Sequence, residues 1–290
     1  MSHIFITARP TQIITALAVC EHLDLSNDTT IIVSNSFENA SVIVDNFSSY
    51  KPAFNFSLVP SFDAAIEAAI SKMPAHVFLY LDVGFRAQKK IRRLRQANGK
   101  NKISVFEDGV GTYRKDIYSI AKKIILSLLG FPVNAGGSKY IDDIYLFDKK
   151  KYIENAQNKP NNIIQIKTGL IDFIDARQKE LWSVFSARDF YESFKSMNGK
   201  ICLIYLSNYE FDISDLTDIF HGDGVKILKL HPHCNAKIRG NDIIISPKWV
   251  PAELLITLAS DIFDCVHVFH QNSSASLYIK KKNVKFTNLG

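Results

Sequence analysis

The chain has 290 residues, of which 47% are hydrophobic and 22% charged, a composition close to that of an average globular protein. It excludes a disordered chain, a collagen-like repeat and a coiled coil. Lys and Arg number 35 against 29 Asp and Glu, and this net charge of +6 fits an anionic substrate, a nucleic acid or an anionic membrane face without choosing among them.

The first half of the chain alternates short apolar runs with amphipathic stretches. Strands are predicted over residues 3–7, 30–34, 56–59, 76–81, 102–106, 144–147 and 163–166, and helices over 11–23, 37–47, 63–73 and 85–97. Strands that alternate with helices at this spacing indicate a parallel α/β sheet.

The middle of the chain is polar and turn-rich at 149–151 and 155–162, and one or two helices of mixed charge are predicted over 172–194. We expect the connection between two domains here. The alternation then restarts, with strands over 200–206, 225–230, 242–246, 265–269 and 284–286 and helices over 213–220, 251–260 and 273–280. The sequence therefore predicts a two-lobed α/β protein, whose ligands should bind at the carboxyl ends of the strands.

The cysteines, the N-terminus and the apolar segments indicate where in the cell the protein is expected. The four cysteines, Cys20, Cys202, Cys234 and Cys265, form no CxxC pair, so reduced thiols are expected rather than a zinc site. The N-terminus lacks the basic and apolar regions of a signal peptide. The longest apolar segment, 124–133, is shorter than the roughly 20 residues of a membrane span. We expect a cytoplasmic protein, either free or bound at the inner face of the membrane.

Two motifs directly follow predicted strands. Glu107 and Asp108 precede a glycine after strand 102–106; a carboxylate there can accept a proton from an attacking hydroxyl, although Asp-Gly is also a common turn. His231 and Pro232 follow strand 225–230; the imidazole can donate to a phosphate, or it can simply lie in a surface loop. His233 adds a second imidazole, but no third ligand has matching local spacing, so no metal is expected.

Three further positions are weaker signals. Ser273 and Ser274 follow strand 265–269 at the start of a predicted helix, where they can bind an anion or act as an ordinary N-cap. Glu253 lies in the first turn of helix 251–260, where it can cap the helix or accept hydrogen bonds from ribose. Asn208 follows strand 200–206 and is singled out by position alone.

The densest positive charge lies on helix 85–97. The segment 110–131 adds Arg114, Lys115, Lys122 and Lys123 next to an apolar stripe over 124–129. Together they can lie on an anionic membrane face, or they can be the solvated side of core helices. Beside the basic helix the sequence has no aromatic platform of the kind that nucleic-acid binders use, so no nucleic-acid partner is expected. It also contains no Walker A motif and no GxGxxG motif.

In their order along the chain, these motifs resemble those of the bacterial sialyltransferases. The family's D/E-D/E-G, HP and Ser-Ser motifs match 107–109, 231–232 and 273–274, with Pro-x-Glu at 251–253. The segment 7–12, Thr-Ala-Arg-Pro-Thr-Gln, is similar to the start of the lipooligosaccharide sialyltransferases, and the capsule polysialyltransferases share the same motifs. The resemblance implies a GT-B fold. Residues 1–175 would form an acceptor-side Rossmann-like domain, and residues 176–290 a nucleotide-sugar domain facing it across a central cleft.

The resemblance also implies a reaction: inverting, metal-independent transfer of sialic acid from CMP-sialic acid to a hydroxyl of a lipooligosaccharide, O-antigen or capsule glycan. Asp108 would be the general base, with Glu107 as the neighbouring candidate, and His231 would donate to the leaving phosphate. The nucleotide side would comprise Ser273 and Ser274 on the phosphate, Glu253 on the ribose, and Asn208 and Pro232 lining the pocket. No cofactor is implied.

Several alternatives stay open. The C-terminal lobe is small for the family, which allows a reduced acceptor region or another CMP-nonulosonate such as the pseudaminic, legionaminic or Kdo donor. Some relatives of the lipooligosaccharide family are hexosyltransferases. An epimerase or hydrolase of the same fold, and a non-catalytic basic protein that binds a membrane or polyanion, are further classes. Expected partners are the CMP-sugar, a glycan acceptor and, peripherally, an anionic membrane; an oligomer is allowed.

Overall fold

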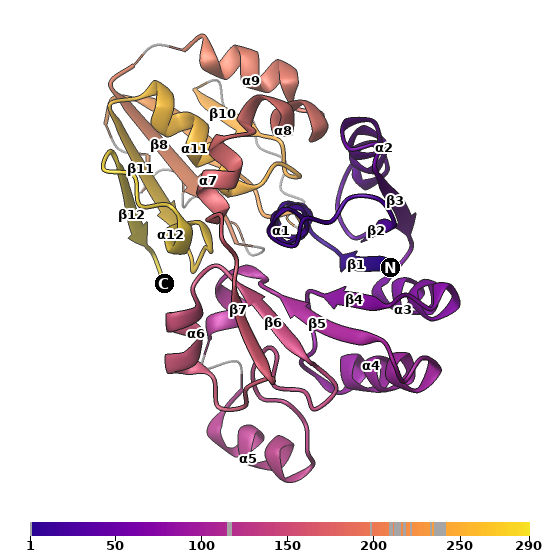
Figure 1. Cartoon of the computed structure of the whole chain (residues 1–290). Coiled ribbons are helices and arrows are strands. Elements are labelled where there is room, and N and C mark those ends of the chain that lie inside the picture. The colour runs from indigo at the N-terminus through magenta and orange to yellow at the C-terminus, as the bar shows by residue number, and fades with distance from the viewer. Residues whose placement is uncertain are drawn as a thin grey trace. The chain divides into compact units, whose positions relative to one another are not determined.

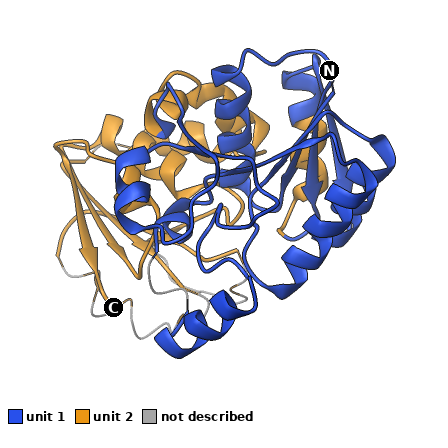
Figure 2. Cartoon of the chain, turned by 60° about the horizontal axis from the view of Figure 1, so that its bottom comes forward, with its two compact units in different colours: residues 1–36, 47–170 blue, residues 37–46, 171–290 orange. Residues whose placement is uncertain are grey.

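A computed structural model describes residues 2–114, 118–197, 199–208, 211, 216, 219–220, 222–232, 234 and 242–290. The described chain is an α/β protein with two parallel sheets (Figure 1). Its residues group into two compact units, the first formed by 1–36 and 47–170 and the second by 37–46 and 171–290 (Figure 2). The division into two domains between residues 175 and 176 stays a prediction.

The first unit holds a seven-stranded sheet of order β3-β2-β1-β4-β5-β6-β7, in which all neighbouring strands pair in parallel. Its strands are β1 (His3–Thr7), β2 (Thr29–Ser34), β3 (Phe54–Val59), β4 (His76–Leu79), β5 (Lys102–Phe106), β6 (Asp143–Leu146) and β7 (Asn162–Gln165). β2 is buried along its whole length, as expected of a parallel strand whose sheet is covered on both faces.

The segments between these strands are mostly helical. They are α1 (Pro10–His22), α2 (Ala40–Tyr50), α3 (Phe62–Lys72), α4 (Phe85–Ala97), the 3-10 helix η1 (Gly109–Tyr113), α5 (Ile120–Leu128) and α6 (Lys149–Asn155). Pro10 opens α1, where a missing N–H breaks no helical hydrogen bond, and most of α1 is buried. α5 differs from the other helices of the sheet in having no buried residue.

The second unit holds a five-stranded parallel sheet of order β10-β9-β8-β11-β12. Its strands are β8 (Ile201–Leu206), β9 (Val225–Lys229), β10 (Ile243–Ser246), β11 (Cys265–His270) and β12 (Val284–Asn288). The helices are α7 (Leu170–Asp175), α8 (Gln178–Val184), α9 (Arg188–Lys195), α11 (Ala252–Ile262) and α12 (Ala275–Tyr278). Most of α11 is buried, including Glu253 in its first turn.

The parallel α/β architecture predicted from the sequence is confirmed, with a strand at each predicted place. The turn-rich prediction for 149–151 is wrong: Asp148 caps α6 there by accepting a hydrogen bond from the Lys151 N–H (2.9 Å), and lysines favour helix. The predicted connector 172–194 is three helices, and the helix predicted over 213–220 lies mostly outside the described residues. Within the described ranges, no helix has the length and apolar character needed to span a bilayer.

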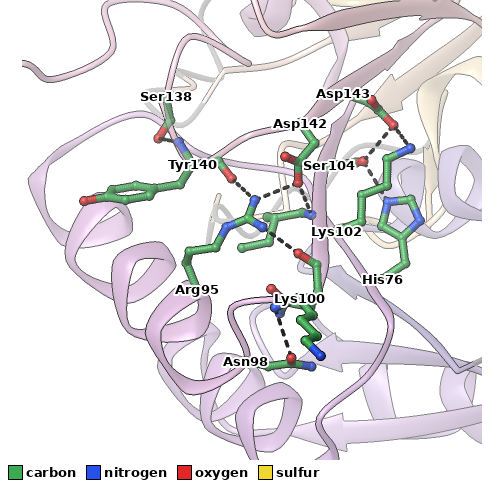
Figure 3. A network of polar contacts seen from close by, with 12 residues as sticks. His76, Arg95, Asn98, Lys100, Lys102, Ser104, Ser138, Tyr140, Asp142 and Asp143 are labelled. Carbon is green, nitrogen blue, oxygen red and sulfur yellow. Dashed lines mark hydrogen bonds and ion pairs between the residues drawn. The ribbon is translucent and has the colours of Figure 1, made fainter.

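Side chains tie together the amino ends of β4 to β7, and Figure 3 shows the contacts that join β4, β5 and β6. His76 Nε2 lies 2.7 Å from the Ser104 hydroxyl, which is 3.5 Å from the fully buried carboxylate of Asp143. Asp143 also pairs with Lys102 and accepts a hydrogen bond from the Asn162 amide (2.8 Å). Because these groups satisfy one another, this edge of the sheet is structural, and the carboxyl edge is left for ligands.

His76 makes stability depend on pH. Burial, with Lys102 and His3 nearby, lowers the pKa of His76 from 6.5 to about 3. Between these values the unfolded chain binds a proton that the folded chain does not, so stability falls as the pH drops below about 6.5. At about 1.4 kcal/mol per pH unit, His76 lowers the free energy of unfolding by about 2 kcal/mol as the pH drops from 6.5 to 5.

We expect His76→Gln to lose about 2 kcal/mol less stability than the wild type between pH 7 and pH 5, as measured by urea unfolding. His267→Gln is the matched control, because His267 also contacts a hydroxyl (Thr287, 2.9 Å) but is only partly buried. Parallel pH curves for the wild type and His76→Gln would contradict this assignment.

Candidate functional site

Each sheet has a point where its strand order reverses, and ligands of open α/β sheets bind at the carboxyl ends of the strands there. In the first unit this point lies between β1 and β4, because β2 and β3 continue on one side and β5 to β7 on the other. In the second unit it lies between β8 and β11. The residues singled out from the sequence lie along the carboxyl edges of the two sheets, close to these places.

Asp108 lies at the carboxyl edge of the first sheet, just after β5. Its Oδ1 accepts a hydrogen bond from the Gln12 side-chain amide (2.6 Å), and its Oδ2 lies 3.7 Å from the Arg9 guanidinium. Gln12 is itself fixed, because its Oε1 accepts a hydrogen bond from the Ala8 N–H (2.7 Å). The segment after β1 therefore positions a carboxylate that comes 96 residues later in the chain.

The carboxylate of Asp108 is partly exposed to solvent and has a raised pKa. About a quarter of its side chain (26%) is exposed. Its partly desolvated surroundings raise its pKa, while Arg9 and Gln12 oppose this rise. Tyr80, which follows β4, has its pKa raised to about 12 by burial and by the nearby Asp108 carboxylate. A solvent-accessible acid with a raised pKa is suited to accept a proton near neutral pH.

Glu107 has a different environment from its neighbour. Its side chain is buried (1% exposed), and its Oε2 accepts hydrogen bonds from the Tyr113 hydroxyl and the Phe147 N–H (2.7 Å for Phe147). The Tyr113 hydroxyl in turn accepts a hydrogen bond from the Asp148 N–H (3.1 Å). Glu107 thus joins the ends of β5 and β6 and η1, and its geometry is that of a structural acid.

The carboxyl edge of the second sheet brings together residues from three strands. Across the reversal point, the Asn208 amide after β8 donates a hydrogen bond to the Gln271 side-chain oxygen after β11. The Ser207 hydroxyl accepts a hydrogen bond from the backbone N–H of His231 (2.9 Å), which follows β9. The His231 and Pro232 side chains are half-buried. Asn208 and the His-Pro pair therefore lie on the same edge.

Glu253 and the serine pair also meet there. The Ser274 hydroxyl donates a hydrogen bond to Glu253 Oε1 (3.0 Å), although 21 residues separate them. Ser274 makes no side-chain hydrogen bond that caps α12, while the Ser273 hydroxyl accepts one from the Ala275 N–H (3.3 Å). Glu253 is buried (2% exposed), and burial raises its pKa against the opposing effects of Ser274 and Lys229.

Lys229, the last residue of β9, is buried beneath this edge. Its ammonium donates hydrogen bonds to the carbonyl oxygens of Lys248 (2.7 Å) and Leu230 (3.2 Å). Burial lowers its pKa to about 7, although the Glu253 carboxylate opposes this shift. Lys229 therefore fixes the chain that leads into His231.

Sequence reasoning missed several of these residues: Arg9, Gln12, Tyr80, Lys229 and Gln271. Arg9 and Gln12 belong to the 7–12 segment, which was noted only for its family resemblance. Arg9 is polar and closely follows an apolar strand, the same signal that selected Asp108, whereas Gln12 lies in the first turn of the helix after that strand. Lys229 carried no signal, because a lysine within a strand is usually exposed.

The structure also has a cavity of about 330 Å³ in the first unit. Its lining residues are Arg114, Lys123, Val133, Asn134, Glu154, Asn155, Ala156 and Gln157. None of the candidate catalytic or nucleotide-binding residues lines it, whereas Arg114 and Lys123 of the segment 110–131 do. It is linked to the acid motif through Asn155, whose amide donates a hydrogen bond to the Tyr113 carbonyl (3.1 Å).

Metal ligands and cysteines add no further site among the described residues. No group of three or more His, Cys, Asp or Glu side chains suited to a metal occurs within the described part of the chain. Cys20, Cys202 and Cys234 are buried thiols and Cys265 is partly buried, and burial raises the pKa of Cys202 to about 12.

Comparison with known proteins supports the fold. The sequence matches no protein-family model, and no curated protein matches it. Among solved structures, the chain is similar to a UDP-glucosyltransferase from Polygonum tinctorium capable of glucosylating indoxyl, in complex with 3,4-dichloroaniline. The TM-score is 0.57 at 10% identity, covering 99% of this chain and 79% of that chain. At this identity the likeness concerns the fold alone, and it supports the expected GT-B type.

The two neighbouring acids should respond differently to neutralisation. Glu107→Gln alters a buried acceptor of two hydrogen bonds, and a buried polar group left without its partner costs about 1–3 kcal/mol, so we expect unfolding stability to fall by about that amount. Asp108→Asn should change stability by less than about 1 kcal/mol, because the Asp108 carboxylate is partly exposed and its ion pair is long. Urea unfolding of both variants tests this. Equal losses would mean that Asp108 also supports the fold.

Proposed function

We propose that this protein is an inverting glycosyltransferase of the GT-B type that moves sialic acid from CMP-sialic acid to a hydroxyl of a bacterial surface glycan. One observation carries the proposal: residues that match the sialyltransferase motifs lie at the carboxyl edge of each sheet, close to the point where the strand order reverses. The fold-level likeness to a glucosyltransferase supports the sugar-transfer class. The donor and acceptor rest on the motif resemblance.

On the acceptor side, Asp108 is the proposed general base. Its exposed carboxylate oxygen would take the proton of the acceptor hydroxyl as the hydroxyl oxygen attacks C2 of the sialic acid. A positioned base of this kind contributes about 10²–10⁴ in rate. Gln12 and Arg9 would orient the carboxylate. Glu107 would support this site by joining η1 to the sheet.

On the donor side, the bond from C2 to the phosphate oxygen would break, and CMP would leave with the bonding electrons. His231 would donate to the leaving phosphate, and Ser273 and Ser274 would hold it. Removing one such donor typically costs about 10²–10³ in rate. Glu253 would orient Ser274, whose hydroxyl donates a hydrogen bond to it. The contact of Glu253 with the ribose remains a prediction, as do the contacts of Asn208 and Pro232 with the nucleotide.

The proposed transfer requires that residues of both units act on one donor–acceptor pair. Attack from the side of Asp108, opposite to the leaving phosphate, inverts the anomeric centre. The step balances without a metal or cofactor, since the acceptor proton passes to Asp108 and the negative charge to CMP.

A second candidate is a hexosyltransferase that uses a UDP-sugar. It is favoured by the fold-level likeness to a UDP-glucosyltransferase. Transfer of another CMP-nonulosonate fits the same residues as transfer of sialic acid. The base of the bound nucleotide distinguishes the two candidates, because transfer from CMP-sialic acid requires cytosine and transfer from a UDP-sugar requires uracil.

A thermal-shift series with CMP, CDP, UDP and GDP tests the proposal. We expect CMP to stabilise the protein, by about 2.7 kcal/mol at 100 times its Kd. His231→Ala should weaken this shift. Asp108→Asn, which alters the acceptor side only, should keep it and is the matched control. Stabilisation by UDP and not by CMP would favour the hexosyltransferase over the sialyltransferase. No shift with any nucleotide would contradict both candidates.

A further inference from the structure

The most unusual surface of the described chain is α5. Five large apolar side chains on it and at its end are 57–82% exposed: Ile120, Ile124, Ile125, Leu128 and Leu129. At 3.6 residues per turn they occupy one half of the helix circumference, and Lys122 borders that half. Figure 1 shows α5 beyond the ends of the nearby strands rather than packed on a face of the sheet. Exposed apolar patches of this kind mark interaction sites.

The apolar patch continues onto α4. Phe85, the first residue of α4, is 70% exposed, and its ring centroid lies 5.5 Å from that of Phe131, which follows α5. The start of α4 and the end of α5 are therefore neighbours, and the side of α4 that carries Phe85 adjoins the α5 patch.

One basic stripe of α4 is largely neutralised within the protein. Arg86, Lys90 and Arg93 lie at i, i+4 and i+7 and face α3. Arg86 pairs with Asp63 (2.7 Å), Lys90 with the same carboxylate (3.5 Å), and Arg93 with Glu67 (2.6 Å). This stripe holds α3 against α4 and presents little unbalanced charge.

A second basic stripe is not neutralised. Lys89 and Arg92 follow Phe85 at the same i, i+4 and i+7 spacing, so they share its side of α4. Both are exposed, and neither forms an ion pair with any part of the chain that the structure describes. Most of the unbalanced positive charge of α4 therefore lies on the side next to the α5 patch.

We propose that the apolar half of α5, Phe85, and the cations Lys89, Arg92 and Lys122 form a docking surface for an anionic lipid membrane. Apolar side chains would enter the boundary between headgroups and acyl chains, while the cations contact lipid phosphates. Charge favours this occupant over a second copy of the chain, because a symmetric contact would bring the same unpaired cations together.

Vesicle flotation at low ionic strength tests the surface without any nucleotide or glycan, so its outcome is independent of the proposed catalytic function. The wild type should bind vesicles of phosphatidylcholine with about one third phosphatidylglycerol, and bind pure phosphatidylcholine much more weakly. Lys89→Gln with Arg92→Gln should weaken binding to the anionic vesicles about 30-fold, since each basic residue near such a surface contributes about fivefold.

Two matched controls make the test specific. Arg86→Gln with Arg93→Gln removes the same net charge from the neutralised stripe, and should weaken binding much less. Ile124→Ser with Leu128→Ser should weaken binding at least tenfold without lowering the unfolding midpoint, because both side chains are already exposed. Met73→Ser replaces an exposed apolar residue at the end of α3, outside the proposed surface. It should leave vesicle binding unchanged.

Three results would overturn the proposal. One is a wild type that ignores anionic vesicles, and another is equal weakening by the Lys89–Arg92 and Arg86–Arg93 pairs. The third is a concentration-dependent dimer, seen by light scattering, that Ile124→Ser with Leu128→Ser dissociates, since this would assign the surface to a second copy.

Discussion

The reversal of strand order in each parallel sheet is the constraint on which the chemistry of this molecule depends. Where the order reverses, the connections leave toward opposite faces, and the strand ends between them stay open. In the first sheet this places the segment after β1 beside the ends of β4 and β5, so that Gln12 reaches Asp108. In the second sheet it places Asn208 beside Gln271.

The two edges of the first sheet hold carboxylates in different environments. At the amino edge, Asp143 is fully buried and its partners Lys102, Ser104 and Asn162 surround it. At the carboxyl edge, Asp108 keeps part of its surface open and has one short hydrogen bond. A saturated carboxylate stabilises the fold, whereas an open one with a raised pKa remains available for proton transfer. The same contrast separates Asp108 from Glu107.

Much of the fold and part of the site could be predicted from sequence, because both rest on local patterns. Buried parallel strands appear as short apolar runs, and the residues just after them lie at the carboxyl edge. Contacts such as Gln12–Asp108 and Glu253–Ser274 could not be predicted, since they join distant segments that only the sheet order brings together. The spacing of α5 showed an apolar side, but whether that side meets the core depends on tertiary packing.

Acceptor-dependent release of CMP from CMP-sialic acid, compared between the wild type and Asp108→Asn, tests the central claim most directly. The account predicts that the wild type releases CMP in step with transfer to a glycan hydroxyl. Asp108→Asn should then be slower by about 10²–10⁴, because the acceptor loses its base. Transfer by Asp108→Asn at the wild-type rate would contradict the role of this carboxylate and the site built around it.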